Sequence, residues 1–433
     1  MVGFSSPAGR IQSGKLNSST NRFIFMAMDM DFISKLFVVP VLLLALGTMW
    51  IVAPIVGIDA PKHRYAPVDG LRGFLAMFVF LHHSSSWYYF ARIHQWSIIP
   101  SALYNQFGST SVAMFFMITS FLFFSKLIES YGRKFDWLKL YVSRTVRIIP
   151  LYAVAVIALF VVVGFVTHFT LHESVGRLML QFGQWLIIME PNVNQLNGTK
   201  FIICGVQWSL AYEWLFYCSL VFFGWLFFRL KPSLLTILIA AIFFVIFALI
   251  IANYYSARVW LRLWPFASGL VAAFVVRNKK AKKIFSDILF TPILLVLIYI
   301  GVFLYPLIFS FIPLVCMTVV FIGICCGNSL FGILIWKPCR LLGQISYSVY
   351  LLHGLLLFIT FYFALGFEQA ARFSILEHWV TICICSIFVV IVCSFSYYYI
   401  EKPGTESATG LTRKVREFFG MKLPSVPKST ISH

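Results

Sequence analysis

The segment VDGLRGFLAMFVFLHHSSSWYYF, residues 68–90, is long and apolar enough to cross a bilayer, yet it contains an arginine and two histidines. Arg72 and His83 lie eleven residues apart. At about 100° per helical residue, this spacing returns to nearly the same face of a helix, about 16 Å further along its axis. Ionisable groups inside a lipid-spanning segment are costly and indicate function. We therefore expect Arg72 and His83 to line a path from the membrane edge towards its middle.

His83 is suited to general base catalysis, because an imidazole titrates near neutral pH and can take a proton from an alcohol. Its neighbour His82 points about 80° away from the Arg72 face, so His83 is the stronger candidate. Arg72 follows Asp69, a predicted N-cap, and can alternatively extend its side chain to the lipid headgroups. The serines at positions 84–86 can form a covalent intermediate in principle, but no histidine and acid at a recognisable spacing support that chemistry.

A second basic site occurs in SRTVRIIPLY, residues 143–152. Arg144 and Arg147 are three residues apart, which places both guanidinium groups on one helix face. Two adjacent guanidiniums can bind phosphate oxygens through paired hydrogen bonds, which suits a phosphorylated cofactor. The alternative is that these arginines set the membrane topology and contact lipid headgroups.

Three further ionisable residues lie in apolar, aromatic surroundings: Glu213 in QWSLAYEWLFY, His353 in GQISYSVYLLHG and Glu401 in YYYIEKPG. Glu213 needs a partner, for which Arg258 and Arg262 are candidates, and a structural ion pair is as consistent with the sequence as catalysis. His353 is typical of a hydrogen-bonded packing group, and Glu401 of an acid that holds an arginine in place. We expect these three residues to support the site.

The composition indicates a polytopic membrane protein. Hydrophobic residues make up 60% of the 433-residue chain and charged residues 11%, and the mean hydropathy of +0.89 is far above that of water-soluble folds. The formal charge of +19 does not indicate nucleic acid, because most lysines and arginines lie in alternate loops and in the C-terminal tail, as the positive-inside rule describes. The cysteines show no CxxC spacing, and adjacent histidines cannot share a helix face, so we expect no metal ion.

Eleven apolar segments are long enough to cross a bilayer. They are residues 36–58, 70–90, 109–127, 146–168, 206–228, 234–254, 259–276, 288–305, 307–326, 345–365 and 379–400. The predicted fold class is therefore an all-α polytopic membrane protein. Residues 174–190 carry too many polar groups to span, and we expect a re-entrant or surface helix there, within an outer loop at 169–205.

This pattern divides the chain into four parts. Residues 1–35 form an N-terminal tail, 36–58 an extra N-terminal transmembrane helix, 65–404 the membrane domain that carries the motifs, and 405–433 a basic, flexible cytoplasmic tail. A spanning first helix leaves the basic residues before position 36 outside, against the charge rule. Translation from a methionine at positions 26–30 would remove most of this conflict, and a non-spanning or cleaved first segment is the alternative.

The motifs, in this order, resemble those of acyltransferase family 3, integral membrane proteins that O-acylate sugars and related acceptors. The matching features are DGLRG at 69–73, the spacing of Arg72 and His83, the Arg144 and Arg147 pair followed by Pro150 and Tyr152, WSL with Glu213 downstream, SYSVYLLH at 346–353 and IEKP at 400–403. The resemblance covers residues 65–404 and implies a ten-helix acyltransferase core, to which the first span adds an eleventh helix. In the family, the motif FFxI, here residues 115–118, is often followed by Ser-Gly, whereas this chain has Thr119 and Ser120. We therefore expect that a close approach of the backbone at this position is lost.

The resemblance implies an enzyme that is a membrane O-acyltransferase. It makes His83 the essential histidine and makes Arg72, Arg144 and Arg147 the charges on the donor side. We therefore expect His83, as general base, and Arg72 to be catalytic, and Arg144 and Arg147 to bind the donor. The donor is then acetyl-CoA or another short acyl-CoA arriving from the cytoplasm, with no permanently bound cofactor. The acceptor is a hydroxyl of an extracytoplasmic or lipid-linked saccharide.

We expect the protein in the inner membrane of a bacterium, with membrane lipid and a glycan as partners, and the alternation of basic loops predicts a cytoplasmic C-terminus. Aromatic residues near the outer side, such as Trp96, can stack on sugar rings or form the usual interfacial belt. The alternative function is a transporter or flippase of a polar or lipid-linked substrate, with Arg72, Glu213 and His353 along its path. A catalytically silent scaffold for polysaccharide assembly is the third hypothesis.

Overall fold

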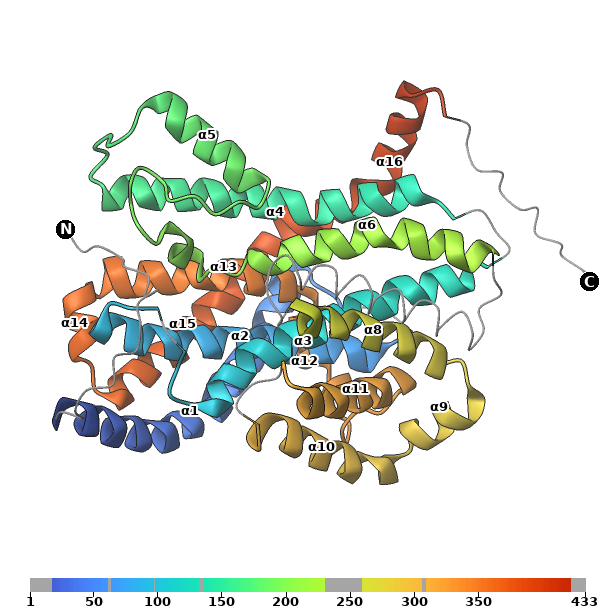
Figure 1. Cartoon of the computed structure of the whole chain (residues 1–433), viewed down its shortest axis with the longest axis horizontal. Helices are drawn as coiled ribbons and strands as arrows, with labels where there is room; N and C mark the ends of the chain where they lie inside the picture. The colour runs from blue at the N-terminus through green and yellow to red at the C-terminus, as the bar shows by residue number, and fades with distance from the viewer. Residues whose placement is uncertain are drawn as a thin grey trace, which may run out of the picture.

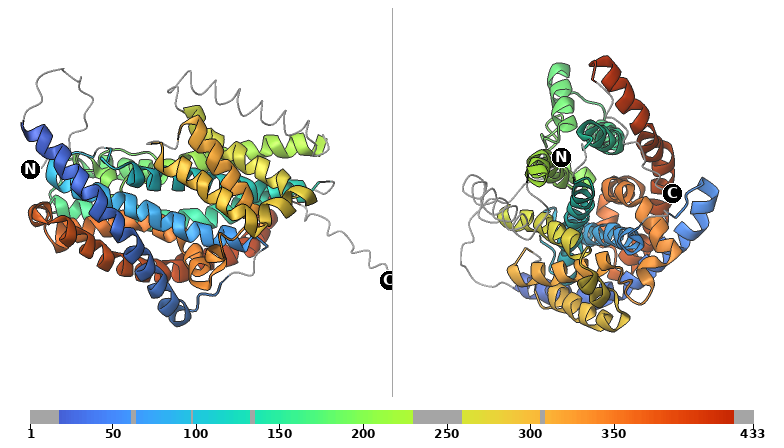
Figure 2. Two further views of the ribbon diagram at one scale, coloured as in Figure 1. Left: turned by 90° about the horizontal axis from the view of Figure 1, so that it is seen from below. Right: turned by 90° about the vertical axis from the view of Figure 1, so that its right-hand side faces the viewer.

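The computed structural model describes residues 18–60, 64–96, 98–131, 135–229, 259–305 and 309–421, without the side chains of 18–33, 227–229 and 259–261. Within these residues the chain is helical, and a single β-bridge joins Val193 to Leu196. Most long helices run side by side along the long axis of the molecule, and the first helix crosses them obliquely (Figures 1 and 2). The predicted all-α membrane fold is confirmed.

The α-helices follow the chain in the order α1 (Ser18–Val56), α2 (Ala66–Ile93), α3 (Ala102–Glu129), α4 (Trp137–Val166), α5 (Val175–Leu186), α6 (Trp208–Arg229), α8 (Val259–Val275), α9 (Lys279–Ser286), α10 (Thr291–Phe303), α11 (Phe311–Cys326), α12 (Lys337–Gln344), α13 (Ser346–Phe358), α14 (Phe367–Arg372), α15 (Ile375–Ser396) and α16 (Lys402–Phe418). Short turns of 3-10 helix are η1 (Thr199–Ile203), η2 (Ile288–Phe290) and η3 (Ile333–Ile335). The π-helical turns η4 (Ile359–Ala364) and η5 (Tyr397–Glu401) follow α13 and α15.

Six of the described helical segments are long and apolar enough to cross a membrane: Ser34–Val56, Ala102–Glu129, Trp137–Val166, Trp208–Leu226, Ser346–Ala364 and Ile375–Phe418. The pair Lys279–Ser286 and Ile288–Phe303, bent by 67°, makes a seventh if it is counted as one span. Apolar helices α8 and α11 are shorter, and α2 is long but more polar. Ten of the eleven expected spans thus coincide with helices of unequal length, and residues 234–254 lie outside the described part of the chain.

Helix α2 is the central helix of the fold. It is buried along most of its length, against α3, α12 and α13. The helix begins at Ala66, and Pro67 suits its first turn because the fixed φ of proline is already helical. Tyr65 therefore occupies the N-cap position, and the prediction that Asp69 caps the helix was wrong. Asp69 lies within the first turn instead, where a negative charge still interacts favourably with the helix dipole.

The DGLRG motif brings the first turns of α2 into backbone contact with η3 and α12. A Cβ atom on Gly70 would lie 1.8 Å from the carbonyl oxygen of Leu334, and one on Gly343 would lie 1.9 Å from that of Asp69. Side chains cannot fit at these positions unless the backbone moves. The glycines therefore fix the end of α2 that carries Arg72.

Helices α3 and α8 approach closely although Thr119 and Ser120 replace the glycine that we expected to be needed there. The glycine comes from the facing helix, because a Cβ atom on Gly269 of α8 would lie 2.4 Å from the carbonyl oxygen of Met117. The Ser120 hydroxyl adds a hydrogen bond to the carbonyl oxygen of Phe266 on α8. The expected loss of close approach is therefore corrected: the contact is kept, with the glycine on the other helix.

The outer loop contains a helix at the predicted place. Helix α5 begins after Ser174, whose hydroxyl accepts a hydrogen bond from the backbone nitrogen of Arg177 at 3.3 Å. The buried Trp185 donates from Nε1 to the carbonyl oxygen of Pro191 at 3.0 Å, and its own carbonyl oxygen accepts a 2.7 Å hydrogen bond from the Tyr152 hydroxyl on α4. These bonds tie the loop to α4.

The chain after residue 404 is helical as far as Phe418, where the sequence suggested a flexible tail. Helix α16 packs against α4 through Gly404, on which a Cβ atom would lie 2.3 Å from the carbonyl oxygen of Val146. Arg416 Nη2 forms an ion pair with Asp136 Oδ1 at 2.5 Å. Helix α16 lies across the axis of the bundle (Figures 1 and 2). Its order comes from these tertiary contacts, which the polar composition does not reveal.

Candidate active site

His83 and His353 form a buried hydrogen-bonded pair between α2 and α13. His83 Nδ1 lies 2.8 Å from His353 Nε2. His353 Nδ1 lies 2.8 Å from the carbonyl oxygen of Val349, one turn earlier on α13. His83 is 9% exposed and His353 is completely buried. His353 is thus hydrogen-bonded, as expected of a packing group, but its partner is the candidate base.

This chain of hydrogen bonds assigns the protons. A carbonyl oxygen only accepts, so His353 Nδ1 carries the proton of the neutral ring and donates to Val349. His353 Nε2 is therefore an acceptor, and His83 Nδ1 must donate to it. In this tautomer the lone pair of His83 is on Nε2, which becomes the basic atom. His353 orients His83 much as the acid orients the histidine of a catalytic triad.

His82 makes its hydrogen bond to α3 and not to this pair, although its ring touches that of His83 edge to face, with ring centres 4.7 Å apart. Its Nδ1 lies 2.8 Å from the carbonyl oxygen of Tyr104 on α3. Helix α3 can approach the ring because residue 108 is glycine: a Cβ atom on Gly108 would lie 2.6 Å from His82 Cδ2. His82 therefore packs between α2 and α3.

The serines that follow the histidines are engaged with their own helix. Ser84 Oγ donates to the carbonyl oxygen of Phe80 at 2.8 Å, and Ser86 Oγ donates to that of His82 at 3.1 Å. A hydroxyl that donates to the preceding turn is not presented to a substrate. The geometry therefore gives no support for a covalent intermediate on Ser84 or Ser86.

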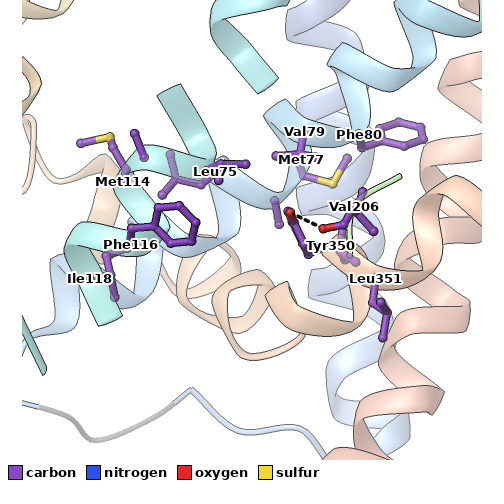
Figure 3. Packing of buried hydrophobic residues seen from close by; sticks show 14 of the residues in the cluster. Leu75, Met77, Val79, Phe80, Met114, Phe116, Ile118, Val206, Tyr350 and Leu351 are labelled. Carbon is purple, nitrogen blue, oxygen red and sulfur yellow. Dashed lines mark hydrogen bonds between the residues drawn. The ribbon is translucent and has the colours of Figure 1, made fainter. Parts of the chain in front are cut away.

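Aromatic rings cover His83 on the side of η1. The ring centres of His83 and Trp96 are 6.1 Å apart. Phe201 of η1 stacks on Trp96, with ring centres 5.0 Å apart and planes inclined by 19°. Apolar residues of α2 and α3 pack against each other near Tyr350 of α13 (Figure 3). The histidine pair itself is buried, with aromatic rings over His83.

Three guanidinium groups gather around the first turns of α2. Arg72 interacts electrostatically with Arg147 and Arg144, and also with the acids Asp69 and Glu401. Within the described residues, none of the three arginines has a carboxylate within 4.0 Å. Three positive charges without direct ion pairs can attract a polyanion.

Glu401 and Glu213 flank this arginine cluster. Glu401 is 3% exposed, accepts a hydrogen bond from the Ser348 hydroxyl and interacts electrostatically with Arg147 and Arg72. Within the described residues Glu401 makes no ion pair, so the expectation that it holds an arginine in place stays a prediction.

Glu213 accepts a hydrogen bond from the Tyr217 hydroxyl and interacts with Arg144. The suggested partner Arg262 instead donates to the Tyr212 hydroxyl at 3.3 Å and lies 5.3 Å from the ring centre of Trp208. The prediction that Glu213 pairs with Arg262 was therefore wrong. Arg258 lies outside the described residues.

One face of α13 connects the arginines to the histidine pair. Tyr347, Tyr350 and His353 follow each other at intervals of three residues, so each lies about 60° round the helix from the last and together they form a continuous stripe along it. Tyr347 interacts electrostatically with Glu401 and Arg147, and its hydroxyl donates to the carbonyl oxygen of Ile148 on α4 at 2.9 Å. The two parts of the site, joined in sequence by α2, are thus joined a second time by α13.

The family model of acyltransferase family 3, described as an acyltransferase domain, matches residues 65–399. The chain belongs to acyltransferase family 3. It is a multi-pass membrane acyltransferase, as the apolar helices and the family both indicate. No curated protein and no solved structure matches the chain. The match includes every predicted site residue of this acyltransferase except Glu401, which lies two positions beyond it.

Two features of the acyltransferase site escaped the sequence analysis. The contact between His83 and His353 joins residues 270 positions apart, so no local pattern indicates it. Gln207 is completely buried at the start of the QWSL motif, where its polarity beside an aromatic span was the available signal.

Most thiols of the acyltransferase are buried. All nine cysteines are free, seven of them are buried and Cys218 is exposed, and burial raises the pKa of the Cys204 thiol in the loop before α6. Within the described residues, no group of three or more histidines, cysteines or acids is arranged to hold a metal ion. The candidate chemistry therefore rests on the imidazole pair and the arginines.

Proposed function

We propose that this acyltransferase moves an acetyl or other short acyl group from acyl-CoA to a hydroxyl of an extracytoplasmic or lipid-linked saccharide. The supporting observation is the juxtaposition on α2. One helix carries Arg72, among the unpaired guanidiniums, in its first turns and the basic nitrogen of His83 eleven residues later. A polyanion site and a general base at a fixed spacing suit a donor with phosphates at one end and a thioester at the other.

In the proposed reaction, His83 Nε2 takes the proton of the acceptor hydroxyl as its oxygen attacks the thioester carbonyl carbon. The new C–O bond forms and the C–S bond breaks. The proton then passes from His83 to the departing sulfur, which gives the ester and free coenzyme A. His353 accepts the hydrogen bond from His83 Nδ1 and stabilises the imidazolium that forms between these steps.

On the donor side, Arg144 and Arg147 bind the phosphates of the acyl-CoA. Arg72 lies where the pantetheine arm of the acyl-CoA enters. The proposed orientation places this end and the C-terminus in the cytoplasm of a bacterium, with the protein in the inner membrane. The four lysines of α9 support it, because basic segments remain on the cytoplasmic side. Trp96 and Phe201 then lie on the acceptor side, where their rings can stack on a sugar.

The proposal is tested by following label from acetyl-CoA into the saccharides of membrane vesicles that contain the protein. We expect His83→Ala to lower transfer at least about a hundredfold, because the general base is lost. His82→Ala is the matched control: it removes the adjacent histidine, which faces α3, and is expected to retain transfer.

Full transfer by folded His83→Ala protein would contradict the assignment. Passage of an intact labelled saccharide across the vesicle membrane, without use of acetyl-CoA, would indicate a transporter instead.

A further inference from the structure

Gln207 is a buried glutamine whose side-chain amide has no hydrogen-bond partner among the described residues. The residue is 0% exposed, and both Nε2 and Oε1 are unpaired. A buried amide without partners costs stability, so it persists where function requires it. Gln106, also 0% exposed, shows the ordinary case: its Nε2 donates to the carbonyl oxygen of Tyr305 at 2.6 Å, and its Oε1 accepts from Thr110 at 2.8 Å.

The segment that leads to Gln207 packs against the part of α13 that carries His353: a Cβ atom on Gly354, the next residue, would lie 2.5 Å from the carbonyl carbon of Ile203. The Tyr350 hydroxyl holds the residues on both sides of Gln207: it donates to the carbonyl oxygen of Val206 at 3.0 Å (Figure 3) and lies 2.7 Å from Ser209 Oγ. Tyr350 is one turn before His353 on the same face of α13. The segment that contains Gln207 is therefore held against α13 by the residue one turn before His353.

The same segment leads to the arginine cluster. Glu213 follows Gln207 by six residues, about 9 Å along α6. Glu213 and its partner Tyr217 both interact electrostatically with Arg144. The chain from Gln207 to Glu213 thus connects the segment that packs on α13 with a residue that interacts with Arg144.

We propose that Gln207 binds the secondary amide nearest the sulfur in the pantetheine arm of acyl-CoA. This inference rests on the proposed function. The N–H and C=O of a trans secondary amide point in opposite directions, so this amide engages one end of the Gln207 side chain, its N–H with Oε1 or its C=O with Nε2, and the second amide of the arm engages the other end. A phosphate only accepts and would leave Oε1 unpaired. Two methylene groups separate this amide from the sulfur, so its capture presents the thioester to His83.

Ligand-induced stabilisation tests the inference. Thermal unfolding of the full chain is measured alone, with coenzyme A, and with adenosine bisphosphate, the nucleotide portion without the arm. We expect coenzyme A to raise the unfolding temperature of the wild type more than the nucleotide does. In Gln207→Leu this additional rise is lost and the effect of the nucleotide is kept. Without ligand, the variant unfolds at or above the wild-type temperature, because an unpaired amide has been removed.

Gln106→Leu is the matched control. It breaks two hydrogen bonds, so it unfolds at a lower temperature than the wild type, but it keeps the additional rise with coenzyme A. In transfer assays, Gln207→Leu is expected to raise KM for acetyl-CoA about tenfold and to leave KM for the acceptor unchanged.

The inference would be overturned if coenzyme A, compared with adenosine bisphosphate, raised the unfolding temperature of Gln207→Leu as much as that of the wild type. A change confined to KM for the acceptor would also overturn it and would assign Gln207 to the acceptor hydroxyl. If neither coenzyme A nor acetyl-CoA acts on the wild type, the proposed function itself fails, so the two failures are distinguishable.

Discussion

The hydrogen bond from His83 Nδ1 to His353 Nε2 leaves only one nitrogen of His83 free to accept a proton. Without His353, the buried Nδ1–H loses its acceptor and the ring can adopt the other tautomer. We expect His353→Ala to lower kcat about a hundredfold and to leave KM for acyl-CoA unchanged. His353→Gln should recover part of kcat, since a glutamine oxygen can accept the same hydrogen bond. Steady-state kinetics of the two variants measures both effects.

His378→Ala is the control for loss of a buried ring. His378 is 1% exposed, and its Nε2 lies 3.0 Å from the carbonyl oxygen of Ser84. Its removal is expected to lower stability and to keep kcat. Equal losses of kcat in His378→Ala and His353→Ala would show that the effect of His353 is only structural.

At the residue scale, spacing along one helix could be predicted and contacts between helices could not. The sequence brought Arg72 and His83 onto one face, and Arg144 beside Arg147, because the helical period alone decides this. The pairing of His83 with His353 depends on how α2 and α13 pack, which no local pattern contains.

At the scale of single elements, glycines set the closest helix contacts. A Cβ atom on Gly70 would overlap the backbone of Leu334 at 1.8 Å, so Gly70→Ala requires α2 and η3 to separate. We expect this variant to lower the free energy of unfolding by more than about 2 kcal/mol. Thermal unfolding in detergent measures the loss.

Gly410→Ala is the matched control, because no atom lies within 4 Å of a Cβ at this exposed position of α16. It is expected to raise stability by up to about 1 kcal/mol through helix propensity. Similar losses from both substitutions would contradict the packing argument.

Helix positions could be predicted from apolar length, whereas helix ends and partners required the structure. The apolar segments marked ten described helices because burial in lipid requires long apolar runs. The start of α2 depended on Pro67 rather than on Asp69. The close approach at Ser120 depended on Gly269 of another helix, and the order of α16 on its contact with α4.

At the scale of the whole molecule, positive charge concentrates at the end of the bundle where the donor is proposed to bind. Rising salt concentration should therefore raise KM for acyl-CoA in the wild type, because it screens attraction between the cations and the phosphates. The double variant Arg144→Gln, Arg147→Gln is expected to raise KM about tenfold at low salt and to show a weaker salt dependence. Initial rates over a salt series measure both.

Arg413→Gln is the control for a change of net charge alone, because its side chain is 69% exposed on α16. It is expected to keep both KM and its salt dependence. A double variant with the salt dependence of the wild type would contradict donor binding at Arg144 and Arg147.

The architecture as a whole followed from composition and motif order, and the family match confirms the resemblance. The arrangement of the helices did not follow, because lipid-facing and protein-facing apolar residues look alike in a sequence. The two ends of the candidate site were visible in the motifs. The connection through α13 and the buried amide of Gln207 required coordinates.

The stretch of α2 between Arg72 and His83 has a fixed length of about 16 Å. It contains no proline and no residue with positive φ, and it is buried against neighbouring helices, so nothing in it favours a kink. Under the proposed function, a thioester on a shorter carrier stops before the imidazole, and one on a longer carrier passes it. On that proposal, the helix would select donors by the length of the carrier and not by the acyl group.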